Sequence, residues 1–382
     1  MGATNLAMDM NRLPIDLDRM LDTLRRWVES ESPTWDAAAV SGATGAIARD
    51  FAVAGGRIEP LAGRMGFAGC VRISFPHATT GPGVLLLGHA DTVHPIGAIA
   101  MSPWRRDDER WGGPGVVDMK GGLCTSLEAI RQLAAAGIST PLPLTVLLTS
   151  DEEAGSPSTR EVIEAEAARH KYVLVPEPGR TDGGVVTGRY AIARFTLQAI
   201  GRPSHAGARL ADGRSAIREM ARKILAIEAM TTEDCTFSVG VIAGGRWVNC
   251  VPARCTGEAL SMAKRQCDLD SAVSRMLALA SETPDITFTA MRGATRPVWE
   301  TSARDWALYE QARTIAASLG VELPHQSAGG GSDANFTGSM GIATLDGLGP
   351  VGDGYHTLDE HLRVGTLAIR TRLMAGLLAT LA

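Results

Sequence analysis

The chain has 382 residues, of which 45% are hydrophobic and 21% are charged. This is the composition of a packed globular protein and excludes a disordered chain or a coiled coil. With 37 Lys and Arg against 42 Asp and Glu, the net charge is −5, so the chain lacks the basic field that gathers nucleic acid. The six cysteines show no C-x-x-C spacing, which excludes a thiolate zinc cluster and a thioredoxin-type pair.

No apolar run approaches the roughly 20 residues that a membrane-spanning helix needs. The first residues, MGATNLAMDMNRLPID, lack the basic segment followed by an apolar segment that is typical of a secretory leader. Scattered cysteines fit a reducing compartment. We therefore expect a cytoplasmic protein with no membrane partner and no nucleic-acid partner.

The first half of the chain alternates between helical and strand-like patterns, which indicates an α/β fold. Continuous apolar runs in the last three of its strands predict burial on both faces of a sheet. The expected elements are a helix over 17–31, strands over 71–75 and 84–89, a helix over 121–135, and strands over 144–150 and 172–176.

The pattern changes near Thr187, where a strand with alternating polarity begins. The order that follows is βαββαβ, which is typical of a ferredoxin-like α+β domain. Its expected elements are strands over 189–200, 236–242, 255–262 and 286–290 and helices over 214–230 and 270–281. After Arg292 the α/β pattern resumes with a helix over 302–319, a glycine-rich turn over 328–333, a strand over 341–345 and a helix from 362. We interpret the middle segment as an inserted domain.

The segment LLLGHADTVHP takes a buried strand directly to His89, two residues before Asp91. Because ligands bind at the carboxyl ends of strands in open α/β sheets, both side chains are well placed to act. His89 could bind a metal ion through one ring nitrogen while Asp91 accepts the N–H of the other. Taken alone, the motif is more typical of a histidine with an ordinary structural role.

Further acidic and histidine side chains follow other apolar segments. Asp118 precedes two glycines and a helix, three acids occupy 151–153, Glu177 follows the strand over 172–176, and His356 stands in GDGYHTLDEHL. Each has an ordinary alternative, namely a helix cap, a solvated turn or a plain loop. Together they form a mixed nitrogen and oxygen donor set suited to zinc or a similar divalent ion: His89, Asp118, Glu153, Glu177 and His356.

The motifs GHADTVHP, DMKGG, SDEEAGS, EPG, SHAG and GYHTLDE occur in this order along nearly the whole chain. In order and spacing they resemble the di-zinc exopeptidase family of glutamate carboxypeptidase, acetylornithine deacetylase and succinyl-diaminopimelate desuccinylase. SAGGGSDANF and EPG are most similar to the glutamate carboxypeptidase branch. The resemblance implies a three-layer α/β/α catalytic domain over 1–186 and 295–382, with the ferredoxin-like domain inserted at 187–294 as a dimerisation and lid domain.

The resemblance also implies a metal centre with two zinc ions per chain, for which Mn²⁺ or Co²⁺ could substitute. His89 and Glu177 would hold one ion, Glu153 and His356 the other, and Asp118 would bridge the two. Two such ions can bind a shared water, lower its pKa and polarise a carbonyl group.

Three further residues receive catalytic roles from the resemblance. Asp91 would orient His89, and Glu152 would act as general base. His205, in SHAG, would come from the partner subunit of a homodimer and stabilise the oxyanion. From the sequence alone His205 is also open to being a surface loop residue. The peptide bond after Asp118 is expected to be cis.

The expected substrate is a small molecule that carries an amide and a carboxylate. Candidate substrate-binding residues are Asn249 in NCVP, Arg292 or Arg296 as a carboxylate clamp, and Gly331 and Ser332 in the glycine-rich turn. The leading prediction is a zinc-dependent, glutamate carboxypeptidase-like exopeptidase. The alternatives are an N-acyl-amino-acid deacylase, a specialised aminohydrolase with the same metal site, and an inactive binding protein on this scaffold.

Overall fold

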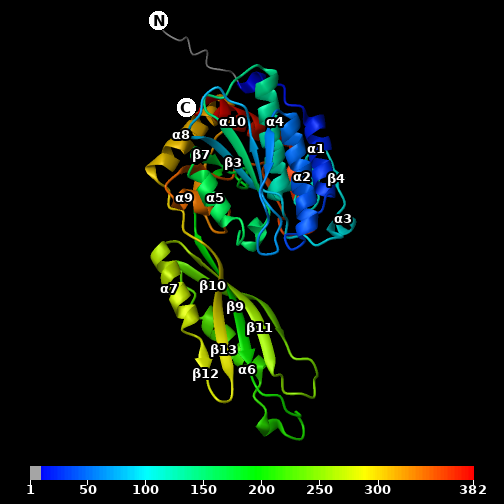
Figure 1. Cartoon of the computed structure of the whole chain (residues 1–382), viewed down its shortest axis with the longest axis vertical. Coiled ribbons are helices and arrows are strands. Elements are labelled where there is room, and N and C mark those ends of the chain that lie inside the picture. Colours follow the sequence, from blue (N-terminus) through cyan, green and yellow to red (C-terminus); the bar gives the residue numbers. More distant parts are fainter. Residues whose placement is uncertain (1–9) are drawn as a thin grey trace. The chain divides into compact units, whose positions relative to one another are not determined.

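The computed structural model describes residues 10–382, which form two compact units (Figure 1). The first unit comprises the described residues up to Gly188 together with Glu300–Ser327 and Ser332–Ala382, and the second comprises Arg189–Trp299 and Ala328–Gly331. A separate unit thus interrupts the chain of the first, which confirms the predicted inserted domain. Residues 1–9, which the sequence assigns to the catalytic domain, lie outside the described residues.

The first unit is built on a six-stranded sheet in the order β1-β2-β6-β3-β7-β15. Strand β3 runs parallel to β6 and β7, and β15 runs parallel to β7, whereas β1 and β2 are antiparallel to their neighbours. Every residue of β3 and β6 is buried, so both faces of the sheet are covered, as the continuous apolar runs predict. The strands are β1 (Arg57–Pro60), β2 (Val71–Ser74), β3 (Gly83–His89), β6 (Leu144–Thr149), β7 (His170–Leu174) and β15 (Ala343–Leu345).

Helices pack on this sheet and on one another. Helix α2 contacts β2, α5 contacts β7, α8 and α9 contact β15, and α10 packs on α4 and α8. Side chains at the N-caps of α1, α2 and α8 accept backbone N–H groups that would otherwise lack a partner. The helices are α1 (Leu17–Glu29), α2 (Ala37–Val53), α3 (Ala98–Met101), α4 (Gly121–Ala135), α5 (Arg160–Ala167), α8 (Ala303–Ser318), α9 (Ala334–Ser339) and α10 (Leu367–Thr380).

A smaller sheet joins two segments that are far apart in the sequence. Its strand order is β16-β17-β5-β4, in which Leu362 pairs with Trp111. The chain just before Asp118 therefore lies beside the chain just after His356. The strands are β4 (Arg105–Arg106), β5 (Arg110–Gly112), β16 (Gly352–Asp353) and β17 (His361–Arg363); β8 (Val185–Arg189) and β14 (His325–Ala328) form a further pair.

The second unit is an antiparallel five-stranded sheet in the order β10-β11-β9-β13-β12, with α6 and α7 packed on it. Burial alternates along β9, as predicted for a sheet covered by helices on one face. The predicted βαββαβ order is confirmed, with β12 as an added short strand. The elements are β9 (Ala191–Ile200), α6 (Ala216–Glu228), β10 (Cys235–Gly244), β11 (Arg254–Ala263), α7 (Gln266–Leu277), β12 (Ser281–Glu282) and β13 (Thr287–Arg296).

Some local predictions were wrong. The last helix begins at Leu367 and not at 362, because residues 361–363 pair with β5 as strand β17. Asp118 precedes helix α4, as the sequence predicts, and lies in the short turn Val116–Lys120. Helix α2 was not predicted, because its alanine- and glycine-rich sequence carries little apolar periodicity. Among residues 10–382, each helix is too short or too polar to cross a membrane.

Candidate metal centre

His89 is the last residue of β3 and is buried. Its Nδ1 lies 2.9 Å from the backbone oxygen of Asp91, so the Nδ1–H donates to this carbonyl group. Its Nε2 lies 3.2 Å from Oδ1 of Asp118 and 3.7 Å from Oε1 of Glu177. The ring is thus fixed on one side and presents Nε2 to two carboxylates on the other, as expected of a metal ligand.

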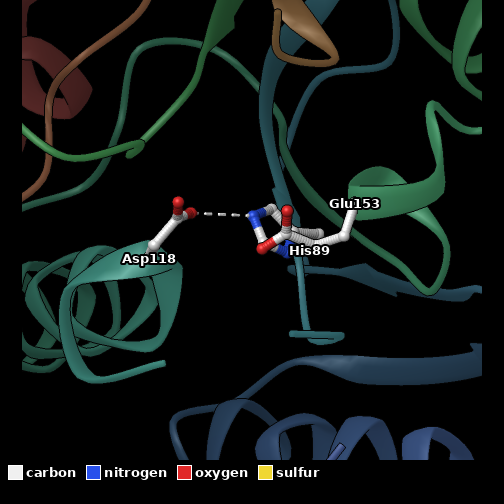
Figure 2. Close-up of side chains that lie close together, drawn as sticks. All are labelled: His89, Asp118 and Glu153. Atoms are coloured by element: carbon white, nitrogen blue, oxygen red, sulfur yellow. Dashed lines mark hydrogen bonds and ion pairs between the residues drawn. The ribbon is translucent and has the colours of Figure 1, made fainter. Parts of the chain in front are cut away.

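Asp118 lies between two histidines. Its Oδ1 is near His89, and its Oδ2 lies 3.5 Å from Nε2 of His356. The peptide bond from Asp118 to Met119 is cis, as the resemblance implies. Figure 2 shows the Asp118 carboxylate, at the start of its helical segment, directed toward His89 at the end of its strand. A carboxylate placed in this way can bridge two cations.

Glu153 and His356 complete the cluster from two other segments. Glu153 is in the short helical turn Glu152–Ala154 that follows β6, and its side chain extends toward His89 in Figure 2. Its Oε2 lies 3.3 Å from Nε2 of His356. His89, Asp118 and Glu153 each offer a donor atom, and these atoms all lie within 4.8 Å of one another. The structure therefore brings all five predicted metal ligands together.

The charges of the cluster perturb one another. Burial, followed by the negative charge of Asp118, raises the pKa of both Glu153 and Glu177. Hydrogen bonds to Asp118 and Glu153 raise the pKa of His356 to about 10. Burial would also raise the pKa of Asp118, but hydrogen bonds from the two histidines outweigh it and lower that pKa. Three carboxylates in so small a buried volume require nearby positive charge.

The donor chemistry fits divalent zinc. Two imidazoles and three carboxylates are typical zinc ligands, and sulfur donors are absent from this set. Four of the five residues come from the ends of strands or from the turns after them, and Asp118 comes from the turn before α4, so well-packed elements hold their backbones in place. These residues could hold two ions with Asp118 between them.

Asp91 was predicted to orient His89, and in the structure it also holds the backbone of the two neighbouring residues Glu152 and Glu153. Its carboxylate accepts the backbone N–H of Glu152 at 3.3 Å and that of Glu153 at 3.2 Å. It also accepts the hydroxyl of Thr34 at 2.8 Å, and its Oδ1 lies 3.5 Å from Nδ1 of His89. Asp91 thus fixes the turn that carries Glu152 and Glu153 as well as facing the ring of His89. Sequence reasoning missed Thr34, which no motif singles out.

Glu360 is a second supporting residue that the sequence prediction missed. It is buried, and its carboxylate accepts the backbone N–H groups of Gly115, Val117 and Asp118 at 2.7, 2.9 and 3.1 Å. His94 Nε2 lies 2.8 Å from the same carboxylate. Glu360 therefore holds the turn that presents Asp118. Its place at the end of the motif GYHTLDE, four residues after His356, was a signal from which this residue could have been found.

Four of the predicted residues lie in the second unit. His205 and Asn249 are exposed and adjacent, since the N–H of Ala206 donates to the backbone oxygen of Asn249 at 2.9 Å. Arg292 is exposed and donates through Nε to Thr295, whereas Arg296 is buried. Their roles toward a substrate remain predictions.

The two predicted residues of the glycine-rich turn have different surroundings. A side chain on Gly331 would clash with the side chain of Arg296. Ser332 is buried, and its hydroxyl donates to Asp346 at 2.7 Å and accepts the N–H of Ala334 at 3.1 Å. The lack of space beside Gly331 and the two hydrogen bonds of Ser332 explain in structural terms why small residues occupy both positions. A substrate contact there remains a prediction.

The sequence of the chain is similar to a known protein family along most of its length. Residues 85–380 match the profile of Peptidase family M20/M25/M40. The chain belongs to this family. Carboxypeptidase G2 of Pseudomonas sp. (strain RS-16) is 31% identical over 306 residues, which cover 77% of this chain and 72% of that protein. Succinyl-diaminopimelate desuccinylase of Xanthomonas campestris pv. campestris is 28% identical over 314 residues, with 76% and 81% covered.

The fold is shared with solved structures at low sequence identity. A tripeptidase from Staphylococcus aureus superposes with a TM-score of 0.77 at 20% identity and covers 96% of this chain and 98% of its own. Family membership makes the protein a hydrolytic metalloenzyme, and it confirms the resemblance seen in the sequence motifs. The clustered His89, Asp118 and Glu153 are where an M20 enzyme of this sequence can bind its metal ions.

Proposed function

We propose that this M20 enzyme binds two zinc ions and hydrolyses an amide bond next to a free carboxylate. The observation that carries the proposal is the cluster of two imidazoles and three carboxylates from five separate segments. His89 and Glu177 would hold one ion and Glu153 and His356 the other, with Asp118 between them. When bound, such a pair lowers the pKa of water and polarises a carbonyl group.

The residues of the chain would supply the proton transfers. Glu152 is buried beside the metal ligands, and its charge affects the pKa of both His89 and Glu177, so its carboxylate is close to the cluster. Its backbone is anchored by Asp91. Glu152 would take a proton from the attacking water and deliver it to the leaving nitrogen. A non-catalytic protein has no use for such a carboxylate beside five retained ligands, which argues against an inactive scaffold.

The favoured substrate is a peptide with a free C-terminal carboxylate, cleaved in the manner of an exopeptidase. Its support is the 31% identity to a carboxypeptidase. Arg292 or Arg296 would clamp the carboxylate through paired N–H groups. Asn249, Gly331 and Ser332 would also contact the substrate.

The second candidate is an N-acyl-amino-acid deacylase. The similarity to a desuccinylase over 76% of the chain favours it, and the same metal site would serve both reactions. In both candidates the nitrogen of the cleaved amide belongs to an amino acid with a free carboxylate, and the candidates differ in the acyl group, which is a peptide in the first and a simple acyl group in the second. A specialised aminohydrolase is a variant of this second candidate.

The enzyme would act as a homodimer through its second unit. Strand β10 is at the edge of the five-stranded sheet and exposes the apolar side chains of Val241 and Ile242. An edge with exposed apolar residues is a surface that a second copy can cover. His205 of one subunit would then donate to the oxyanion in the site of the other.

A hydrolysis screen tests the proposal. Purified enzyme loaded with Zn²⁺, Mn²⁺ or Co²⁺ is offered dipeptides, acyl-glutamates and other N-acyl amino acids, and the released amine is quantified. We expect turnover of at least one class, with the exopeptidase substrates favoured. Absence of turnover in all classes with every metal would contradict the proposal.

A pair of variants links any activity to Glu152. The Glu152→Gln variant should retain metal and fold but lose about 10²–10⁴-fold in kcat, which is the contribution of a general base. Glu109→Gln, which changes an exposed acid of the same unit, is the matched control and should keep full activity. An active Glu152→Gln enzyme would remove the general-base role.

A further inference from the structure

The turn over 151–156 carries both Glu152 and Glu153, so its position decides where these two carboxylates lie. The turn closes on itself, because the N–H of Ser156 donates to the backbone oxygen of the first residue at 2.8 Å. Asp91 holds the first half of the turn through two backbone N–H groups. At the other end, Ser156 is buried and has a φ of +57°. This left-handed backbone is unfavourable for serine, so other contacts must hold it.

Asp333 provides a contact at that end. Its side chain is buried, and Oδ1 accepts the hydroxyl of Ser156 in a short hydrogen bond. Its Oδ2 accepts the hydroxyl of Thr149 at 3.0 Å. Thr149 is the last residue of β6, so one carboxylate joins the end of this strand to the end of the turn that follows it. Hydrogen bonds to a buried carboxylate are roughly twice as strong as those between neutral groups.

The backbone around Asp333 is itself well fixed. The N–H of Ser332 donates to Oδ1 of Asn335 at 3.1 Å, and the hydroxyl of Ser332 donates to the buried Asp346 at 2.7 Å. The same hydroxyl accepts the N–H of Ala334 at 3.1 Å. The Asp333 carboxylate is therefore presented from a rigid segment and can restrain the turn that it contacts.

We propose that Asp333 is a positioning residue, which acts through Ser156 to hold Glu152 and Glu153 in place. This inference rests on the proposed hydrolysis, in which Glu152 is the general base and Glu153 a metal ligand. Asp91 and Asp333 would hold the two ends of the same turn. Loss of the second anchor would loosen the metal ion that Glu153 holds and would displace the general base.

A purely structural role for Asp333 is the alternative, and Asp305 provides the matched comparison. Asp305 is a buried aspartate of the same unit, and its carboxylate accepts the backbone N–H groups of Ser302 and Thr344 at 2.7 and 2.8 Å. Its bonds hold the start of α8 and strand β15. Asp305→Ala should destabilise the fold as Asp333→Ala does, but it should leave zinc retention and turnover unchanged.

Zinc retention tests the proposal without reference to activity. Zinc-loaded protein is dialysed against increasing concentrations of a chelator, zinc per chain is measured by elemental analysis, and circular dichroism checks folding. In Ser156→Ala and Asp333→Ala, one of the two ions should be lost at about 10-fold lower free chelator than in the unchanged protein. Ser156→Ala removes a single hydroxyl, so it keeps the test valid if Asp333→Ala does not fold. A folded Ser156→Ala protein that retains zinc as the unchanged protein does would overturn the proposal.

Kinetics with a substrate found in the hydrolysis screen test the same route. At saturating zinc, both variants should lose about 10-fold or more in kcat, because the general base is displaced. KM should stay within about twofold, because contacts to the substrate are kept. The double variant should be no slower than Asp333→Ala alone, whereas losses that multiply would refute action through Ser156.

Failure of the proposed function is distinguishable from failure of this inference. An unchanged protein that neither binds zinc nor turns over any substrate would contradict the proposed function itself. An unchanged protein that binds two zinc ions, together with folded variants that match it in zinc retention and kcat, would contradict the positioning role alone.

Discussion

Replacing Glu360 with glutamine tests whether a single buried carboxylate holds the turn that presents Asp118. Glu360 accepts three backbone N–H groups and faces His94. In glutamine one carboxylate oxygen becomes an NH₂ donor, which cannot accept from any of them. In the best orientation, the amide oxygen still accepts the N–H groups of Val117 and Asp118, whereas the NH₂ group faces the N–H of Gly115.

The cost follows from these contacts. Leaving the buried N–H of Gly115 unsatisfied costs about 1–3 kcal/mol, and the two retained bonds each lose about 1 kcal/mol of charge assistance. The free energy of unfolding of the metal-free protein should therefore fall by about 3–5 kcal/mol. Because the turn loosens, zinc content should fall as well.

Two measurements check this prediction. Urea unfolding of metal-free protein, followed by fluorescence, gives the change in stability, and elemental analysis after dialysis gives zinc per chain. Asp359→Asn is the matched control, since it changes the neighbouring exposed acid and should cost less than 0.5 kcal/mol. A loss below about 1 kcal/mol for Glu360→Gln with full zinc content would refute the positioning role.

Three further predictions concern the metal ligands and the second unit. Asp118→Ala should reduce zinc content sharply from two per chain, as elemental analysis would show; unchanged zinc would contradict the bridging role. Mixing His205→Ala subunits with Glu152→Ala subunits should restore activity above either parent if His205 acts across the dimer, whereas no gain in an activity assay would exclude this. His356 has a pKa raised to about 10, so it stabilises metal-free protein most below its unfolded pKa of about 6.5 and this contribution is lost as pH rises toward 10. Urea midpoints measured from pH 6 to 10 should therefore fall less steeply in His356→Gln, and identical slopes would contradict the assignment.

The catalytic fold was predictable where apolar patterning was strong. The runs ending at His89 and Thr149 are buried throughout and pair in parallel, so the strand ends meet at one edge as the sequence indicated. Side chains at such ends could be matched to a metal centre because carboxylates and imidazoles gather there. The βαββαβ order was equally visible, since polarity alternates along its first strand.

Other features depend on tertiary contacts that no local pattern carries. Helix α2 has weak periodicity, and its position is fixed by packing on β2. Residues 361–363 have helical neighbours but pair with β5, which is far away in sequence. Glu360 and Thr34 act by accepting or donating hydrogen bonds to distant groups, so their roles emerge only when the chain is folded.

The five candidate ligands are widely dispersed along the chain, from the strand that ends at His89 to the turn that carries His356. During synthesis, a ribosome-bound chain would complete β3 and β6 long before His356 leaves the exit tunnel. Metal uptake by the full donor set would therefore wait until His356 has emerged, because the partial chain offers only an incomplete set of donors. Metal supply in the cell would then limit maturation of this enzyme without limiting the folding of its central sheet.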